Sequence, residues 1–364
     1  ARDPAYQPEP ISSGSPRISM VDGAFHALEG ALPAGLEVQS LQTMLSERPD
    51  EISTLLQSLD ISQPRDAFSA LNTANLNPGL LIRVDAQTDA GELLLQWQSG
   101  DSGDKALFNT RVLILLEPGA SLHLVEQLEN RTEDTATLNQ VVQSELGEQA
   151  RLSHTRVQQI SASSAFISRI ATSQAAGSHF GFTALDMGAG LVRHDVKASL
   201  NGEGAACELN GAVVAGARSH TDHHLEAAHL AGNCESSQLF RAVAQERGRV
   251  VFNGKVYVDK GADGTEAQQS SAGLLLSRLA EIDAKPELEI YADEVIASHG
   301  ATVGQLDDKA MFYLQSRGLG KTEARRILTM AFCRSVADQV KNPALRETLG
   351  TRLSDALSAG MTDD

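Results

Sequence analysis

Histidines are the residues of this chain best suited to bind a transition metal, and four of its ten lie close together. The segment RSHTDHHLEAAHLAGNCES contains His220, His223, His224 and His229. Imidazole is the commonest transition-metal ligand, so a metal site is one interpretation. In a strand, however, His220 and His224 face one way and His223 the other, and no HExxH motif is present. The pattern therefore favours stacked polar side chains on one face of a sheet over a metal site.

His299 lies in a different setting, the segment SHGATVG that begins at Ser298. Strand-like residues precede it, and small residues follow it. Small residues are used where a backbone or a partner must come close. The ordinary explanation for a lone histidine is a buried, hydrogen-bonded ring. Here the small residues favour an interface that a substrate, a metal ion or another chain approaches.

The three cysteines, Cys207, Cys234 and Cys333, do not predict a metal site by themselves. Their number is odd and no CxxC pair occurs, so a structural zinc site built on paired cysteines is not expected. So few cysteines fit a reducing compartment.

Motifs of the common enzyme classes are absent from the sequence. It contains no GxSxG segment, no P-loop and no GxGxxG segment that opens a helix. Lys260, Asp263 and Glu266 could line the cleft of a β-helix enzyme that cleaves polysaccharides. Nothing in their spacing distinguishes them from charges on a solvated loop.

Composition excludes other classes of function. The 364 residues carry 30 basic and 47 acidic side chains, a formal charge of −17. This argues against nucleic acid or an anionic membrane as the main partner, because both need clustered Lys and Arg. No apolar run approaches the ~20 residues of a membrane helix, and the first residues lack the apolar core of a signal peptide. We expect a soluble, cytoplasmic protein.

Helical spacing of apolar residues occurs at both ends of the chain. Near the N-terminus it spans about residues 36–76, with Leu36, Leu41 and Met44 on one face of a first helix and Pro49 at the start of a second. Near the C-terminus, Asp307 is placed to cap a helix, and Asn342 to cap another. We expect an N-terminal helical region over residues 1–78 with a disordered start, and a C-terminal helical region over 307–364.

Between these regions, residues 79–306 alternate apolar and polar positions in many short segments. This period of two is typical of strands, and Gly, Asn, Asp and Ser separate the segments. A sandwich, a barrel and a parallel β-helix could all produce the pattern. Scarce hairpin turns and recurring Gly/Asn corners favour the β-helix modestly, although VVFNGKVYV also fits an ordinary hairpin.

Residues 106–337 resemble the SufB/SufD family of iron–sulfur cluster assembly proteins. The resemblance rests on VFNGKVYV, LLLS, KPELEIYAD, SHGATVG and FYLQSRG, which stand in the order and spacing of the family. It is closest to the SufD branch, because Gly300 follows His299 where SufB has a glutamate, and because LSRLAEIDAKP holds no cysteine. Some SufD members have a cysteine where this chain has Ala297, so no role of that thiol transfers.

The resemblance implies a right-handed parallel β-helix flanked by the two helical regions. It also implies a non-enzymatic scaffold subunit that forms a heterodimer with SufB on two copies of the ATPase SufC. His299 is then a candidate ligand of iron or of a transient iron–sulfur cluster at the SufB interface, with Ser298 and Gly300 beside it. No cofactor is expected on the isolated chain. The alternatives are a SufBD-type homodimer that works without SufB, and a β-helix carbohydrate-active enzyme.

The first C-terminal helices are the candidate contact with SufC. An exposed aromatic residue beside arginines is typical of an interface hot spot. Phe312 and Tyr313 are adjacent, so we expect one to pack on the β-helix and the other to face outward. The alternative is that these helices cap the open end of the solenoid. The candidate contact residues are Phe312, Tyr313, Arg317, Lys321, Arg325 and Arg326.

Overall fold

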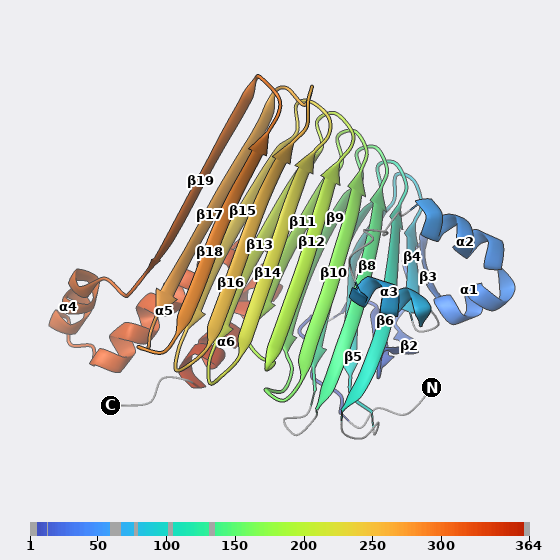
Figure 1. Cartoon of the computed structure of the whole chain (residues 1–364). Helices are drawn as coiled ribbons and strands as arrows, with labels where there is room; N and C mark the ends of the chain where they lie inside the picture. The colour runs from blue at the N-terminus through green and yellow to red at the C-terminus, as the bar shows by residue number, and fades with distance from the viewer. Residues whose placement is uncertain are drawn as a thin grey trace.

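The chain folds into a parallel β-solenoid in which successive strands alternate between two sheets (Figure 1). The computed structural model describes residues 6–12, 14–58, 67–75, 79–100, 105–130 and 135–359. In the solenoid each strand pairs in parallel with the strand two places along the chain. The parallel pairing confirms the predicted β-helix, and the sandwich and barrel interpretations are wrong.

Each sheet grows by one strand per turn. Sheet A runs in the order β19-β17-β15-β13-β11-β9-β7-β5-β1-β2, and sheet B in the order β18-β16-β14-β12-β10-β8-β6-β4-β3. The strands of sheet A are β1 (Arg17–Val21), β2 (Ala24–Glu29), β5 (Asp89–Gln98), β7 (Ser121–Glu129), β9 (Arg151–Gln159), β11 (His179–Asp186), β13 (Ala206–Ala215), β15 (Glu235–Ala244), β17 (Thr265–Leu275) and β19 (Val295–Gly304). Those of sheet B are β3 (Leu36–Ser40), β4 (Gly79–Val84), β6 (Ala106–Leu116), β8 (Ala136–Leu146), β10 (Ala165–Gln174), β12 (Leu191–Leu200), β14 (His220–His229), β16 (Arg249–Val258) and β18 (Glu281–Ile290).

The core lies between the two sheets and follows from the alternation of the strands. Successive side chains of a strand point to opposite faces, so every second residue enters the interior. Most inward positions hold Val, Leu, Ile, Ala or Phe and form one continuous buried cluster along the solenoid. Because the strands are in register, residues at one position of successive turns stack in columns.

Two Asn-Gly pairs, Asn210-Gly211 and Asn253-Gly254, lie inside strands and form no hairpin turn. VVFNGKVYV is a single strand, β16, and Gly254 is within it. A Cβ at Gly254 would come within 2.5 Å of the Phe252 ring, and one at Gly211 within 2.8 Å of the Phe240 ring. Glycine at these two positions therefore makes room for aromatic rings inside the solenoid.

The N-terminal region is not purely helical, which corrects the expectation for residues 1–78. Residues 17–21, 24–29 and 36–40 are strands, and β3 pairs with β4 in antiparallel orientation. Leu36 and Val38 also fit a period of two, and pairing with the first solenoid strand outweighs the helical spacing. Helix α1 (Leu41–Glu47) begins only after β3, α2 (Pro49–Ser58) starts at the predicted proline, and α3 (Ala67–Ala74) lies on β6 and β8. Of the expected disordered start, residues 1–5 and 13 lie outside the described residues. Residues 6–12 pack against sheet A, where Ile11 is buried and the backbone oxygen of Pro8 accepts a hydrogen bond from Gln96, so the expectation is wrong for this segment.

The C-terminal helices cover one face of the solenoid and do not cap its end. Helices α5 (Lys321–Ala337) and α6 (Pro343–Ala359) pack Cys333, Leu349 and Leu353 against outward-facing residues of sheet A. Asn342 caps α6 as predicted, since its side chain accepts hydrogen bonds from the backbone of the first turn. Helix α4 (Asp308–Ser316) lies beyond the last strands next to α5 (Figure 1). None of the described helices is long and apolar enough to cross a membrane.

The alternative that these helices cap the open end is wrong, because α5 and α6 pack on the outer face of sheet A. The outer face of sheet A carries apolar residues such as Val125, Val157 and Leu185, and these would lie in water without the helices. Covering that face buries apolar surface along several turns. The edges of β18 and β19 therefore stay open at the last turn of the described chain.

Candidate functional site

His299 lies on the last strand of sheet A, at the open end of the solenoid. Its register partner in β17 is Gln269, whose own partner in β15 is Gln238. Both glutamines are buried inside the solenoid, so His299 belongs to the inward-facing column. It is nevertheless exposed, because no further turn of the described chain covers β19. The structure thus contradicts the ordinary explanation of His299 as a buried core histidine.

A polar path leads from the interior to His299. The side chain of Gln269 donates a hydrogen bond to Oε1 of Gln238 at 3.2 Å, and Gln238 donates to the backbone oxygen of Lys255 at 3.0 Å. Within the described chain, Oε1 of Gln269 is buried and has no hydrogen-bond partner. Polar side chains therefore occupy the inward-facing column from Gln238 through Gln269 to His299, at the open end of the solenoid.

The surface around His299 is apolar and unpaired. Ile296 is 67% exposed on the same strand, and a Cβ at Gly300 would meet nothing within 4 Å. Ser298 and Gly300 alternate with His299 and so face the other side of the strand. An open strand edge with exposed apolar side chains is a place where another chain can add to the sheet. The exposed apolar residues of the last turn are Ile290, Tyr291, Ile296 and Val303.

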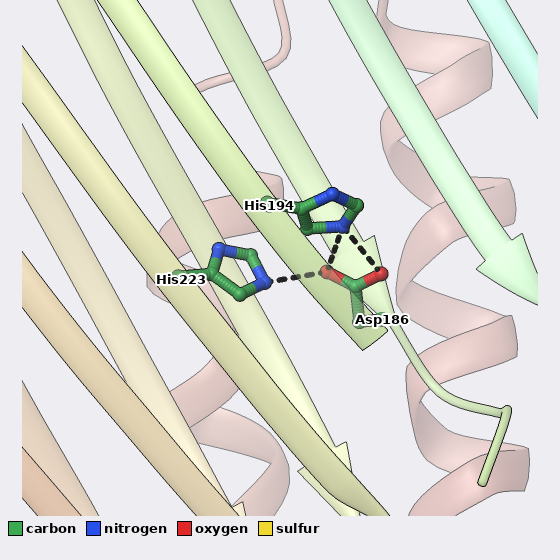
Figure 2. A group of neighbouring side chains, drawn as sticks. All are labelled: Asp186, His194 and His223. Atoms are coloured by element: carbon green, nitrogen blue, oxygen red, sulfur yellow. Dashed lines mark hydrogen bonds and ion pairs between the residues drawn. The ribbon is translucent and has the colours of Figure 1, made fainter. Parts of the chain in front are cut away.

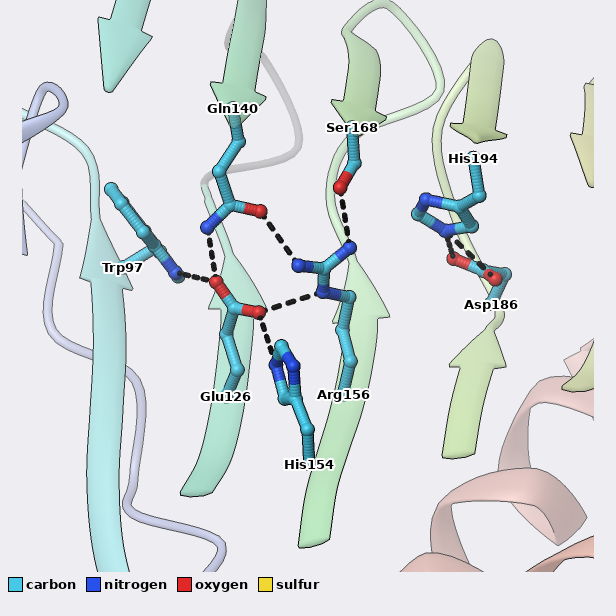
Figure 3. A network of polar contacts seen from close by, with 8 residues as sticks. All are labelled: Trp97, Glu126, Gln140, His154, Arg156, Ser168, Asp186 and His194. Carbon is cyan, nitrogen blue, oxygen red and sulfur yellow. Dashed lines mark hydrogen bonds and ion pairs between the residues drawn. The ribbon is translucent and has the colours of Figure 1, made fainter. Parts of the chain in front are cut away.

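A second group of polar residues is buried deep in the interior, around Glu126 (Figure 3). Glu126 of β7 accepts hydrogen bonds from Nε of Arg156 at 2.7 Å, from Nε2 of His154 at 2.9 Å and from Nε1 of Trp97 at 2.8 Å. Gln140 also donates to it, and Oε1 of Gln140 accepts from Arg156 at 2.7 Å. The cluster ties four strands together by charge-assisted hydrogen bonds.

The protonation of this cluster follows from its contacts. Burial alone raises the pKa of Glu126, but the charge of Arg156 and the hydrogen bonds from His154 and Gln140 outweigh burial and hold that pKa far below its usual range. Burial also lowers the pKa of His154. Glu126 and Arg156 thus form a buried ion pair beside a neutral imidazole.

Two histidines and one aspartate meet in the next turns of the interior (Figure 2). Asp186 ends β11 in sheet A, while His194 and His223 are register partners in sheet B. Nε2 of His223 lies 2.8 Å from Oδ2 of Asp186, and Nε2 of His194 lies 3.1 Å from Oδ1. All three side chains are buried, and burial lowers the pKa of His194 to about 4. Their ligand atoms lie within 4.8 Å of one another, so the three residues form a candidate metal-binding group.

The histidine-rich segment divides between the two faces of β14, as its alternation predicted. His224 faces outward, where Asp222 pairs with it and with Arg193 of the preceding turn. This is the stacking of polar side chains that the sequence favoured over a metal site. His223 faces inward, and so does His229, whose Nε2 lies 2.8 Å from Oγ of Ser236. The four histidines therefore do not form one cluster.

All three cysteines are buried and none lies beside His299 in the structure. Burial raises the pKa of Cys207 and of Cys234, and it raises that of Cys333 to about 12. Thiolates are the form that binds iron. Burial thus disfavours the ligating form of every cysteine of this chain.

The residues of the candidate helical contact have unequal roles in the structure. Phe312 is 73% exposed and Tyr313 is 57% exposed, so the expectation that one of them packs on the β-helix is wrong. Helix α4 has no buried residue and extends past the strands, which leaves both rings in solvent. Arg317 lies over the Tyr313 ring, 5.3 Å from its centroid, and Lys321 is exposed.

The two following arginines are held by this chain itself. Arg325 donates to the backbone oxygen of Leu276, and Arg326 donates to Glu323 at 2.8 Å and to Ser354 at 3.2 Å. These contacts fix α5 on the solenoid and on α6. Among the six candidates, the exposed set is therefore Phe312, Tyr313, Arg317 and Lys321.

Of the three residues considered for a carbohydrate-active cleft, Asp263 has a structural role and the other two are exposed on the surface. Oδ1 of Asp263 accepts hydrogen bonds from the backbone of Asp293 and Glu294, so it holds two neighbouring corners together. Glu266 points outward from β17 and is exposed, as is Lys260.

Comparison with known proteins places this geometry in a family. The family model for the SufBD core domain of the SUF system of FeS cluster assembly matches residues 98–332. An iron–sulfur cluster assembly SufBD family protein of Synechocystis sp. is 29% identical over 94% of this chain and 78% of its own length. SufD of Escherichia coli is 36% identical over 48% of this chain and 41% of its length, and SufD of Bacillus subtilis is 25% identical over 86% and 72%. The chain belongs to the SufBD family of iron–sulfur cluster assembly proteins.

Proposed function

We propose that this chain is a SufD-type scaffold subunit that pairs with a SufB-type partner and, together with a SufC-type ATPase, assembles iron–sulfur clusters. The observation that supports this most is the placement of His299. It stands in the inward-facing column of β19, on an edge that none of the described strands covers. A partner that extends the solenoid there would enclose His299 between the two chains.

The chemistry of the open end suits a shared cluster. Imidazole is a borderline ligand that binds iron beside softer thiolates. His299 supplies one ligand atom, and the buried cysteines of this chain supply none nearby. The remaining ligands therefore have to come from the partner. On this account the cluster is cargo built at the interface, the isolated chain holds none, and this subunit is not itself an enzyme.

The pairing surface predicts the effect of a charge at Ile296. Because Ile296 is exposed, Ile296→Lys should leave the melting temperature of the isolated chain unchanged. Ile296 pairs with the outward-facing Glu266 and so lies on the outer face of the edge strand. A partner strand added to this edge would place the new ammonium group against its own outer face and remove water from it. We expect the affinity for SufB to fall by about 1–3 kcal/mol, the range of a modest hot spot. Analytical ultracentrifugation of the mixed chains measures it.

Leu107→Lys is the matched control, because Leu107 is also an exposed apolar residue on a strand, far from the open end. It should leave the pairing intact. If Ile296→Lys pairs as tightly as the unmodified chain, the open end is not the SufB surface. If self-association of this chain is the reaction that Ile296→Lys weakens, and SufB does not bind, the homodimer replaces the heterodimer.

The exposed residues of α4 predict a contact with the ATPase. Phe312→Ala removes a ring that contributes little to the isolated fold, since the ring is in solvent. We expect it to weaken SufC binding by about 1–3 kcal/mol while SufB pairing stays intact. Calorimetric titration of SufC into the purified heterodimer of this chain with SufB measures the change.

Arg317→Glu should act in the same direction as Phe312→Ala, whereas Arg325 is unsuitable because it anchors α5 to Leu276. Phe68→Ala is the control, since Phe68 is an exposed aromatic on α3. Equal SufC affinity for the Phe312→Ala and Phe68→Ala variants would remove α4 from the contact.

A further inference from the structure

We propose that Asp186, His194 and His223 form a buried binding site for a divalent transition-metal ion, such as Zn²⁺ or Fe²⁺, inside the solenoid. Asp186 comes from β11 of sheet A, and His194 and His223 come from the neighbouring strands β12 and β14 of sheet B (Figure 2). The site is separate from His299 and from any surface of the chain. The proposal of this metal site does not depend on the proposed pairing of this chain with SufB.

The donor set and its spacing suit such an ion. Two imidazole nitrogens and a carboxylate are ligands that both Zn²⁺ and Fe²⁺ accept. The nitrogen–oxygen distances in the group are 2.8, 3.1 and 3.2 Å. Ligand atoms around one tetrahedral ion, bound at about 2.0–2.1 Å each, lie roughly 3.3 Å apart. Only a small outward movement of the rings would admit the ion.

Charge is the strongest argument for a cation. Within the described chain, Asp186 contacts the two histidines and no lysine or arginine. Glu126, the neighbouring buried carboxylate, is paired with Arg156. A buried carboxylate without a cation is strongly unfavourable. Arg156 cannot serve both, because its guanidinium is committed to Glu126, Gln140 and Ser168. A metal ion at the triad would supply the missing positive charge.

The surroundings indicate a structural site and not a catalytic one. The Phe166 ring lies 5.3 Å from the His194 ring, and the Phe240 ring lies 5.2 Å from the His223 ring. Apolar rings thus close the site from water, and Gly211 leaves the space that Phe240 and His223 occupy. Catalytic metal sites have three protein ligands and keep a position open for water or substrate, whereas here both oxygens of Asp186 and Nε2 of each histidine offer four donor atoms. The ion would instead join sheet A to sheet B at the middle of the solenoid.

The test uses the full chain alone, with Zn²⁺ and Co²⁺ as probes. The chain is unfolded in urea with a chelator, refolded with each ion, and exchanged into metal-free buffer. We expect one ion per chain, a visible absorption band of low-coordinate Co²⁺, and a higher melting temperature than that of the chain refolded without metal. If the refolded chain retains neither ion and its melting temperature is unchanged, the proposal is wrong and a proton shared by the triad balances Asp186.

Variants assign the ion to these residues. Asp186→Asn keeps the shape of the side chain, and His223→Phe repeats the aromatic residue that follows it in the column. Both should lose the bound Co²⁺ and its absorption. His224→Phe, on the outer face of the same strand, should retain them. If a variant fails to fold, the metal content of the unmodified chain still decides the question, and retention of Co²⁺ by Asp186→Asn would refute the site.

Discussion

Glu126→Ala is expected to lower the free energy of unfolding by about 3–5 kcal/mol, the largest effect on stability that we predict for a single substitution. Glu126 is fully buried and pairs with Arg156, which is also fully buried. Removal of the carboxylate leaves the guanidinium in the interior without a counter-charge. It also removes the acceptor of Trp97 and His154. Urea denaturation monitored by circular dichroism measures the loss.

Arg249→Ala provides the comparison with a surface pair. Arg249 contacts Asp283 at 2.8 Å, but both side chains are exposed and water screens their charges, so the loss should be far smaller than that of Glu126→Ala. The double variant Glu126→Leu with Arg156→Met removes both buried charges and should recover part of the stability. An equal loss for Glu126→Ala and Arg249→Ala would show that the interior cluster is not a tightly held ion pair.

The carboxylate of Glu126 also predicts that the free energy of unfolding decreases at acidic pH. The pKa of Glu126 is far lower in the folded chain than in the unfolded chain. Between these two values the unfolded state binds the proton more readily, so stability rises with pH there. The contribution of Glu126 is therefore complete above its unfolded pKa of about 4.5 and is lost as the pH falls below it. Glu126→Gln should flatten this part of the profile of unfolding free energy against pH.

His299→Ala is expected to leave the isolated chain and its pairing with SufB near normal, and to reduce the iron and sulfide of the assembled complex several-fold. The ring is exposed, so its removal opens no cavity in this chain. In the complex it would remove the one ligand atom that this subunit offers at the shared interface. Iron and acid-labile sulfide analysis of the co-purified complex measures the loss.

His220→Ala is the control for His299, because His220 is a partly exposed histidine on the outer face of β14. Its complex should mature clusters as the unmodified complex does. Cluster content that is unchanged in His299→Ala would remove His299 from the assembly step. If the His299→Ala variant no longer pairs with SufB, His299 contributes to the contact between the two chains and not to the binding of iron.

Much of the fold is predictable from the sequence because the solenoid depends on local alternation. The period of two holds over the whole of β16 and over the first eight residues of β14, and the inward placement of His223 follows from it. β3 is the exception, since Leu36, Leu41 and Met44 also fit a helix. Its pairing with β4 is a contact across more than forty residues, which local spacing does not contain.

The buried polar groups were not predicted, although a signal for them exists. His154 and Arg156 share a face with Leu152 in RLSHTRVQQI, and His194 shares one with Val192 and Val196. A polar residue on the apolar face of an alternating strand indicates an interior partner. Which partner it meets depends on register between turns and on the opposite sheet. That is why the link of Asp186 with His194 and His223 required the structure.

The position of His299 was predictable, whereas its environment was not. The small residues of SHGATVG indicated an approach of another chain, and the structure shows open space at Gly300. The open end itself depends on where α5 and α6 pack, and they cover sheet A instead of the last strands.

Co-expression of this chain with SufB and SufC of the same source tests the central claim most directly. Anaerobic purification through a tag on this chain, followed by iron and sulfide analysis, should yield a complex of all three proteins that matures clusters. The chain purified by the same tag without SufB should carry neither iron nor sulfide. Failure of SufB and SufC to co-purify, or a stoichiometric cluster on the chain alone, would contradict the account.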